Sequence, residues 1–269
     1  MNINDKMITL ARSYCKNSYT YWVDKYHKER TGNDYLHTYT DTDYDLFPRY
    51  VRIAAILKGI DLLVGKKYKS FNSCVHSLLD AVNFKNAFVD SAKNAIQIKA
   101  MNDEEQKYRK FILNFNENDL MNTNIERLTY KRMLGVHESV KVRNILLDKW
   151  GYDGYWYPIS KENVSDDILF LMAKYISPLE KDIVGFIKNI AFNKYYAIDE
   201  CKEDYKYSIK NFNLSLYQGT ETFCCDKSFE WAVYGSHEGT LTFGGEILVS
   251  KVKELLKGYE SKFNLFEWI

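Results

Sequence analysis

The chain has 269 residues, with 37 basic and 36 acidic side chains and a formal net charge of +1. This balance gives no global field that would draw the chain to nucleic acid or to an anionic membrane, so any such binding needs a local patch. Aromatic residues make up 16% of the sequence, including 22 tyrosines. That composition is typical of a compact, ordered protein with tyrosine-rich surfaces.

The chain begins without the basic and apolar regions of a signal peptide, which favours a cytoplasmic location. The apolar stretch 53–64 is interrupted by Lys58 and Asp61 and is too short to cross a bilayer, so no membrane span is expected. The five cysteines are an odd number without the paired spacing of a zinc site. Reduced structural thiols are the favoured interpretation.

Helical periodicity dominates the N-terminal half. Helices are predicted over residues 4–27, from Pro48 to Gly65, from Ser70 or Asn72 to Phe88, and from Ser91 to about Phe115, with a loop at 31–45. Residues 116–126 combine turn formers with little periodicity, which indicates a junction. We therefore expect a helical subdomain, 1–120, and an α+β subdomain, 121–269, which can also pack as one unit.

The C-terminal half changes from helical to strand periodicity after Asn193. Before that point the pattern predicts a short strand at 128–134 and helices at 137–150, from Ser165 to Ile176, and from Pro178 onward. Strands are then predicted at 195–198, 205–209, 212–217, 220–225, 231–234 and 240–243, followed by a helix at 246–259 and an aromatic tail that docks on the body. The fold class is therefore α+β, with a helical N-terminal half and a C-terminal antiparallel β-meander flanked by helices.

Reactive side chains concentrate in the turn between the last two predicted strands, at Ser236, His237 and Glu238. Neighbouring residues of a strand point to opposite faces, which argues against a local Ser-His-Glu triad. These three residues remain catalytic candidates if a residue distant in sequence meets His237, because histidine titrates near neutral pH. The competing interpretation is a hairpin in which Ser236 and Glu238 bind turn amides and Gly239 supplies a positive φ.

No cofactor or metal site is predicted. Gly244 and Gly245 precede a helix and have amides that can cradle a phosphate, but a tight strand-to-helix turn is the favoured interpretation because no nucleotide-binding glycine motif occurs. The carboxylates of residues 41–45 lack the glycine and the terminal glutamate of an EF-hand loop, so we assign them to capping of the helix at Pro48.

The densest aromatic cluster is formed by Tyr152, Tyr155, Trp156 and Tyr157. Such rings supply contact area for a protein partner, and they can also stack on nucleic-acid bases. Few basic residues lie nearby, which disfavours nucleic acid without excluding it. An aromatic edge packed between the two halves of the chain is the third interpretation.

The block from Trp231 to Gly245 (W-x-x-Y-x-S-H-E-x-T-x-T-F-G-G) and the segment from Trp150 to Pro158 resemble segments of poorly characterised bacterial proteins. Some of those proteins are encoded beside polymorphic toxins as immunity factors. The resemblance implies a defence-related protein that binds another protein and occludes a toxin or effector, and it transfers no catalytic residue. The alternative is a hydrolase or nucleic-acid-processing enzyme that uses His237 and Glu238. The sequence leaves the partner and the oligomeric state open.

Overall fold

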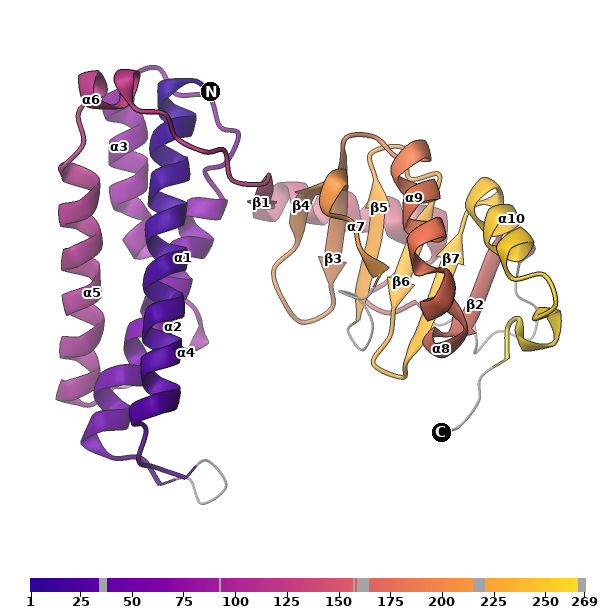
Figure 1. Cartoon of the computed structure of the whole chain (residues 1–269), viewed down its shortest axis with the longest axis horizontal. Coiled ribbons are helices and arrows are strands. Elements are labelled where there is room, and N and C mark those ends of the chain that lie inside the picture. Colours follow the sequence, from indigo (N-terminus) through magenta and orange to yellow (C-terminus); the bar gives the residue numbers. More distant parts are fainter. Residues whose placement is uncertain (34–37, 92, 157, 159–164, 215–220, 266–269) are drawn as a thin grey trace. The chain divides into compact units, whose positions relative to one another are not determined.

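The computed structural model describes residues 1–33, 38–91, 93–156, 158, 165–214 and 221–265 (Figure 1). It divides into two compact units, Met1–Leu128 and Thr129–Ile269, called below the helical unit and the sheet unit. The first is built from helices and the second from an antiparallel sheet with flanking helices, which confirms the α+β class. Among the described residues, no helix combines the length and the apolar character needed to span a membrane.

The helical unit is held together by apolar faces at helical spacing. On α2, Ile53, Ile56 and Ile60 are fully buried, and they pack with Met7 and Cys15 of α1 in one core. Burying each such side chain contributes about 1.5–3 kcal/mol. The elements are α1 (Ile3–Glu29), α2 (Asp41–Asp61), α3 (Phe71–Asp80), η1 (Ala81–Asn83), α4 (Ala87–Asp90), α5 (Ala95–Leu113) and α6 (Glu117–Asn122).

Helix α2 begins seven residues before Pro48, so the predicted start of this helix was wrong. A capping box sets the true start: the Thr40 hydroxyl accepts from the Asp43 amide, and the Asp43 carboxylate accepts from the Thr40 amide at 2.9 Å. The same carboxylate accepts from the Gly32 amide at 2.9 Å. The carboxylate run therefore caps a helix, as expected, but a longer one that contains Pro48.

The predicted helix from Ser70 to Phe88 is interrupted. Ser70 caps α3 as expected, but the regular helix ends at Asp80 and gives way to η1 and the short α4. The Arg52 guanidinium of α2 donates to the carbonyl oxygens of Val82 and Phe84, the latter at 3.0 Å. These tertiary bonds satisfy carbonyl groups that a continuous helix would use internally.

The unit boundary lies after Leu128 rather than after residue 120. The stretch predicted as a junction contains helix α6, whose Leu120 is fully buried in the core of the helical unit. The Lys6 ammonium also donates to the carbonyl oxygens of Leu120 and Thr123, both at 2.8 Å. These contacts attach the segment to α1 and keep it in the helical unit.

The sheet unit contains one seven-stranded antiparallel sheet in the order β1-β4-β3-β5-β6-β7-β2. The strands are β1 (Lys131–Met133), β2 (Ile168–Met172), β3 (Lys194–Asp199), β4 (Tyr205–Ser208), β5 (Thr222–Asp226), β6 (Ala232–Gly235) and β7 (Thr240–Gly244). The helical elements are α7 (Val136–Trp150), α8 (Ala173–Ile176), η3 (Ser177–Leu179), α9 (Glu180–Ile190), η4 (Ile209–Asn211), α10 (Glu246–Leu255) and η6 (Glu260–Lys262).

Both faces of this sheet are covered. Figure 1 shows α9 in front of the strands and α7 behind them. One core places Ile183 and Ile187 of α9 against the face that carries Val233 and Phe243, and the other places Leu146 of α7 against the opposite face. Cys224 and Cys225 lie in these two separate cores, so the adjacent thiols point to opposite faces, as expected from strand geometry.

Residues 168–172 form strand β2, where the sequence predicted a helix. Their apolar run fits helical spacing, but it equally fits a strand buried on both faces. Leu169 and Leu171 are fully buried in one core, and Phe170 is 2% exposed on the other side. The backbone of Phe170 also bonds to Asn264, the described part of the tail that was predicted to dock. Of the predicted strand 212–217, residues 212–214 are not a strand and the rest lies outside the described residues.

Candidate functional site

The turn between β6 and β7 carries the predicted catalytic candidates, and a carboxylate from another segment meets it. In the β5–β6 pairing, Thr222 lies opposite Gly235, which places Glu221 beside Ser236. The Glu221 carboxylate accepts from the Ser236 hydroxyl at 3.1 Å and from the His237 amide at 3.0 Å. It also contacts the Nδ1 atom of His237 and the Tyr234 hydroxyl. Glu221 is therefore the distant partner that the sequence did not name.

The turn itself has the hairpin geometry of the competing interpretation. The Ser236 amide donates to the Thr240 carbonyl at 3.0 Å, and Gly239 has a φ of 73°. The Ser236 hydroxyl accepts from the Glu238 amide at 3.2 Å. Ser236 donates its proton to Glu221 and not to His237, so the arrangement is no Ser-His-Glu triad.

The group in this turn that could still take part in catalysis is the Glu221–His237 pair. The Glu221 side chain is 10% exposed and the His237 side chain is 64% exposed. Burial opposes ionisation of Glu221, but donors from Tyr234, His237 and Ser236 outweigh it and hold the carboxyl pKa below its usual value. Burial, and then the Glu221 carboxylate, raise the pKa of Tyr234. The pair can orient the imidazole, with Nδ1 on the carboxylate and Nε2 available to transfer a proton.

The predicted aromatic partner site is mostly internal. Tyr152 is 1% exposed and Trp156 is 3% exposed, and both rings pack on Phe223 of β5, with centroids 4.9 and 5.0 Å away. Their burial leaves them no surface for a partner. Tyr155 is 50% exposed, and Tyr157 lies outside the described residues. Tyr152 and Trp156 are thus packed side chains, but the contacts given above lie within the sheet unit and not between the two halves.

Close packing of the chain explains the two glycines at the end of β7, Gly244 and Gly245. Gly245 has a φ of 100°, and a Cβ there would lie 2.1 Å from the Glu230 carbonyl oxygen. Its amide donates to the Asp167 carbonyl at 2.8 Å and so is not available to a phosphate. Among the described residues, no group of three or more His, Cys, Asp and Glu side chains could hold a metal ion.

The helical unit contains a pocket of about 550 Å³ that the sequence did not reveal. Most of its lining residues are aromatic, and the others are polar or charged. It is lined by Tyr26, His27, Arg30, Tyr39, Asp43, Tyr44, Phe47, Tyr50, Phe88 and Gln97. These residues come from α1, α2, α4, α5 and the residues between α1 and α2, so no local sequence motif predicts the pocket. We call this the aromatic pocket.

Some of the rings that line the aromatic pocket pack edge to face. The ring centroids of Phe47 and Phe88 are 4.8 Å apart, and those of Phe47 and Tyr50 are 5.2 Å apart, with both pairs nearly perpendicular. Such pairs add about 0.5–1.5 kcal/mol beyond area burial. The Asp43 carboxylate is occupied by the capping bonds of α2. The pocket thus offers ring faces and edges to a ligand, and its other charged lining residue, Arg30, lies over the Tyr26 ring.

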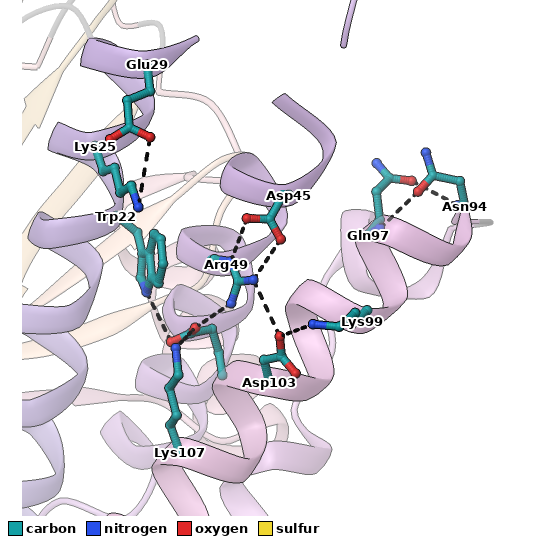
Figure 2. Close-up of polar contacts among 11 residues, drawn as sticks. Trp22, Lys25, Glu29, Asp45, Arg49, Asn94, Gln97, Lys99, Asp103 and Lys107 are labelled. Atoms are coloured by element: carbon teal, nitrogen blue, oxygen red, sulfur yellow. Dashed lines mark hydrogen bonds and ion pairs between the residues drawn. The ribbon is translucent and has the colours of Figure 1, made fainter. Parts of the chain in front are cut away.

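A buried charge network next to the aromatic pocket fixes the helices that form it (Figure 2). Arg49 of α2 binds the Glu104 carboxylate of α5 at 2.8 Å, and their side chains are 8% and 2% exposed. Glu104 also accepts from the Trp22 indole of α1 at 3.0 Å. Because these three helices carry most of the pocket walls, the network holds the pocket in shape without a ligand.

The comparisons with known proteins leave the function to be argued from this geometry. No protein-family model, no curated protein and no solved structure matches the chain.

Proposed function

We propose that the chain is a protein-binding module whose aromatic pocket receives an apolar or aromatic side chain of its partner. The pocket volume of about 550 Å³ is the observation that carries this proposal. It lies within the range of about 300–1,000 Å³ typical of ligand sites, and its walls are predominantly rings. Interface hot spots are buried aromatic or Arg anchors seated in such pockets.

The expected partner is a protein rather than a polar metabolite. Rings dominate the lining: the Asp43 carboxylate is taken up by capping bonds, and the Arg30 guanidinium lies 5.1 Å from the Tyr26 ring centroid. A polar metabolite would leave its own groups unpaired against rings, which costs free energy. The resemblance to immunity-type proteins supports a bacterial, cytoplasmic, defence-related role in which binding occludes a toxin or effector.

The test compares one pocket residue with a matched surface tyrosine. Tagged wild-type protein is purified from its native host, the enriched partner is identified by mass spectrometry, and its affinity is measured by biolayer interferometry. Tyr44→Ala removes a half-buried pocket ring, and Tyr21→Ala removes a ring that is 58% exposed and lies outside the pocket. Truncating a hot spot costs at least about 2 kcal/mol, or roughly 30-fold in Kd.

We expect Tyr44→Ala to weaken binding about 30-fold and Tyr21→Ala to leave it within about threefold. Equal affinities for the two variants would refute the pocket as the contact site. Absence of any enriched partner would refute the binding function itself.

The Glu221–His237 pair favours a second candidate, a hydrolase that uses His237 as a general base. The Nδ1 contact with Glu221 and the 64% exposure of the His237 side chain support it. A hydrolase screen over ester and phosphodiester substrates tests this candidate. General-base catalysis contributes about 10²–10⁴-fold, so His237→Gln should lose that factor while His137→Gln, the same change at an exposed histidine of the same unit, keeps activity. Turnover that survives His237→Gln, or no turnover by the wild type, would refute it.

A further inference from the structure

The sheet unit has a second hollow, of about 270 Å³, at the β3–β4 side of the sheet. It is lined by Phe192, Asn193, Lys194, Lys206 and Lys227, and we call it the lysine pocket. Lys206 lies opposite Tyr196 in the β3–β4 pairing, and Lys194 is two residues before Tyr196, so both lysines emerge on one face. Three cationic side chains from separate segments thus converge on one small hollow.

The charges of these lysines are not neutralised by the described part of the chain. None of the three ammonium groups forms an ion pair with a described carboxylate. The nearest carboxylate in sequence, Asp226, is fully buried, and its oxygens accept from the Phe192 amide at 2.7 Å and the Ser228 amide at 2.8 Å. The pocket therefore concentrates positive charge in a chain whose net charge is only +1.

Aromatic rings hold each ammonium in place. Lys194 lies 3.8 Å from the Tyr130 centroid and Lys227 lies 4.0 Å from the Phe192 centroid. Lys206 lies 4.4 Å from the Tyr196 centroid and donates to the Tyr196 hydroxyl at 3.1 Å. Cation–π contacts stabilise an ammonium without cancelling its charge, and they reduce the side-chain freedom that a ligand would otherwise have to restrict.

Hydrogen bonds also connect the segments that carry the three lysines. The Asp226–Phe192 bond connects the end of β5, which precedes Lys227, to the turn that precedes Lys194. The Ile209 amide donates to the Asn193 carbonyl at 3.0 Å, which connects the same turn to the end of β4. These two hydrogen bonds therefore fix the backbone positions of the three lysines without a ligand.

We propose that the lysine pocket binds a phosphate group carried by a nucleotide or by single-stranded nucleic acid. The volume is just below the range of about 300–1,000 Å³ typical of drug-sized ligands, which suits a compact anion. Lysine is a point-charge binder of phosphate, and Phe192, which lines the pocket and is 47% exposed, is the ring beside which an unstacked base can lie. This site is distant in sequence from the residues of the proposed partner pocket and does not depend on that proposal.

The test uses two probes, inorganic pyrophosphate by calorimetry and a fluorescent 12-residue oligothymidylate by anisotropy, both at low salt. The pocket variant is the triple change Lys194→Gln, Lys206→Gln and Lys227→Gln. The control is the triple change Lys141→Gln, Lys181→Gln and Lys257→Gln, which alters net charge equally at exposed positions of the same unit. Circular dichroism of both variants checks that the fold is retained.

Each charged hydrogen bond lost should weaken binding about tenfold, so the pocket variant should bind at least about 100-fold more weakly than the wild type. The control variant should stay within about threefold. Binding of pyrophosphate alone identifies a small phosphorylated ligand, and much tighter binding of the oligonucleotide identifies nucleic acid. No binding of either probe at about 1 mM, or equal losses in the two variants, would overturn the proposal.

Discussion

The buried charge of Glu104 should be one of the strongest single supports of the helical unit. Its side chain is 2% exposed and contacts Arg49, Lys107 and Trp22 at 2.8, 2.7 and 3.0 Å. Glu104→Gln keeps the shape of the side chain and removes the charge. Arg49, which is 8% exposed, would then lose its only buried counter-charge among its three carboxylate partners in the described chain.

The expected loss follows from burial. Removing one partner of a buried ion pair costs about 3–5 kcal/mol, because the other charge remains desolvated. Arg49 keeps Asp45 and Asp103, which are 41% and 37% exposed and compensate in part. We therefore expect the lower end, about 3 kcal/mol. Asp103→Asn is the matched control, since it makes the same chemical change beside the same arginine at an exposed site, where about 0.5 kcal/mol is expected.

Hydrogen exchange followed by mass spectrometry can measure this loss in one unit of the chain. Peptides of α2 and α5 should exchange about 100-fold faster in Glu104→Gln, and about twofold faster in Asp103→Asn. Peptides of the sheet unit serve as internal controls and should be unchanged. If both variants accelerate exchange by the same factor, burial does not set the strength of this network and the reasoning is refuted.

Three further predictions concern the sheet unit and the thiols. Gly245→Ala should lower the free energy of unfolding by at least about 2 kcal/mol. Gly185→Ala lies in a helix, and its added Cβ meets nothing within 4 Å, so this change should raise the free energy of unfolding by about 0.5–1 kcal/mol. Urea denaturation in which both variants change the free energy of unfolding in the same direction would contradict this. The pKa of Glu221 is lowered in the folded protein, so ionised Glu221 stabilises the fold. The difference in free energy of unfolding between wild type and Glu221→Gln should be complete at neutral pH and should decrease as the pH falls through that pKa. Denaturation curves in which this difference stays constant down to about pH 3 would contradict the prediction. Thiol titration should find Cys201 reactive in the folded chain and the four buried thiols unreactive until denaturant is added. Burial keeps a thiol protonated, and it raises the pKa of Cys74 to about 12. More than one fast-reacting thiol in the folded chain would be inconsistent with the fold.

Local signals in the sequence were sufficient for two long helices with amphipathic spacing. The predicted helices 4–27 and 137–150 correspond to α1 and α7, and Gly151 ends α7 with a φ of 66°. The error at 168–172 has a different origin. A short, wholly apolar run has no polar face to reveal its period, and the partner that makes it a strand, β7, lies about 70 residues away.

The candidate sites show the same limit. The hairpin at Ser236–Gly239 was predictable from its turn residues, whereas Glu221 reaches it only through the register of β5 with β6. The predicted strand 220–225 contained Glu221, but no local signal set its register with the predicted strand 231–234. The aromatic pocket was not predictable either, because its rings come from several segments that only tertiary packing brings together.

Two segments singled out in the sequence, residues 150–158 and 231–245, contribute described residues to one hydrophobic core. A Cβ at Gly244 would lie 2.8 Å from the Trp150 ring and 2.9 Å from the Trp156 ring, so the glycine allows both indoles to approach the strand. Tyr152 and Tyr234 belong to the same core, with ring centroids 6.3 Å apart. Residues buried in this way determine a fold and offer no surface to a partner. If the chain has the proposed binding function, its choice of partner depends on exposed features such as the aromatic pocket, which lies outside residues 150–158 and 231–245.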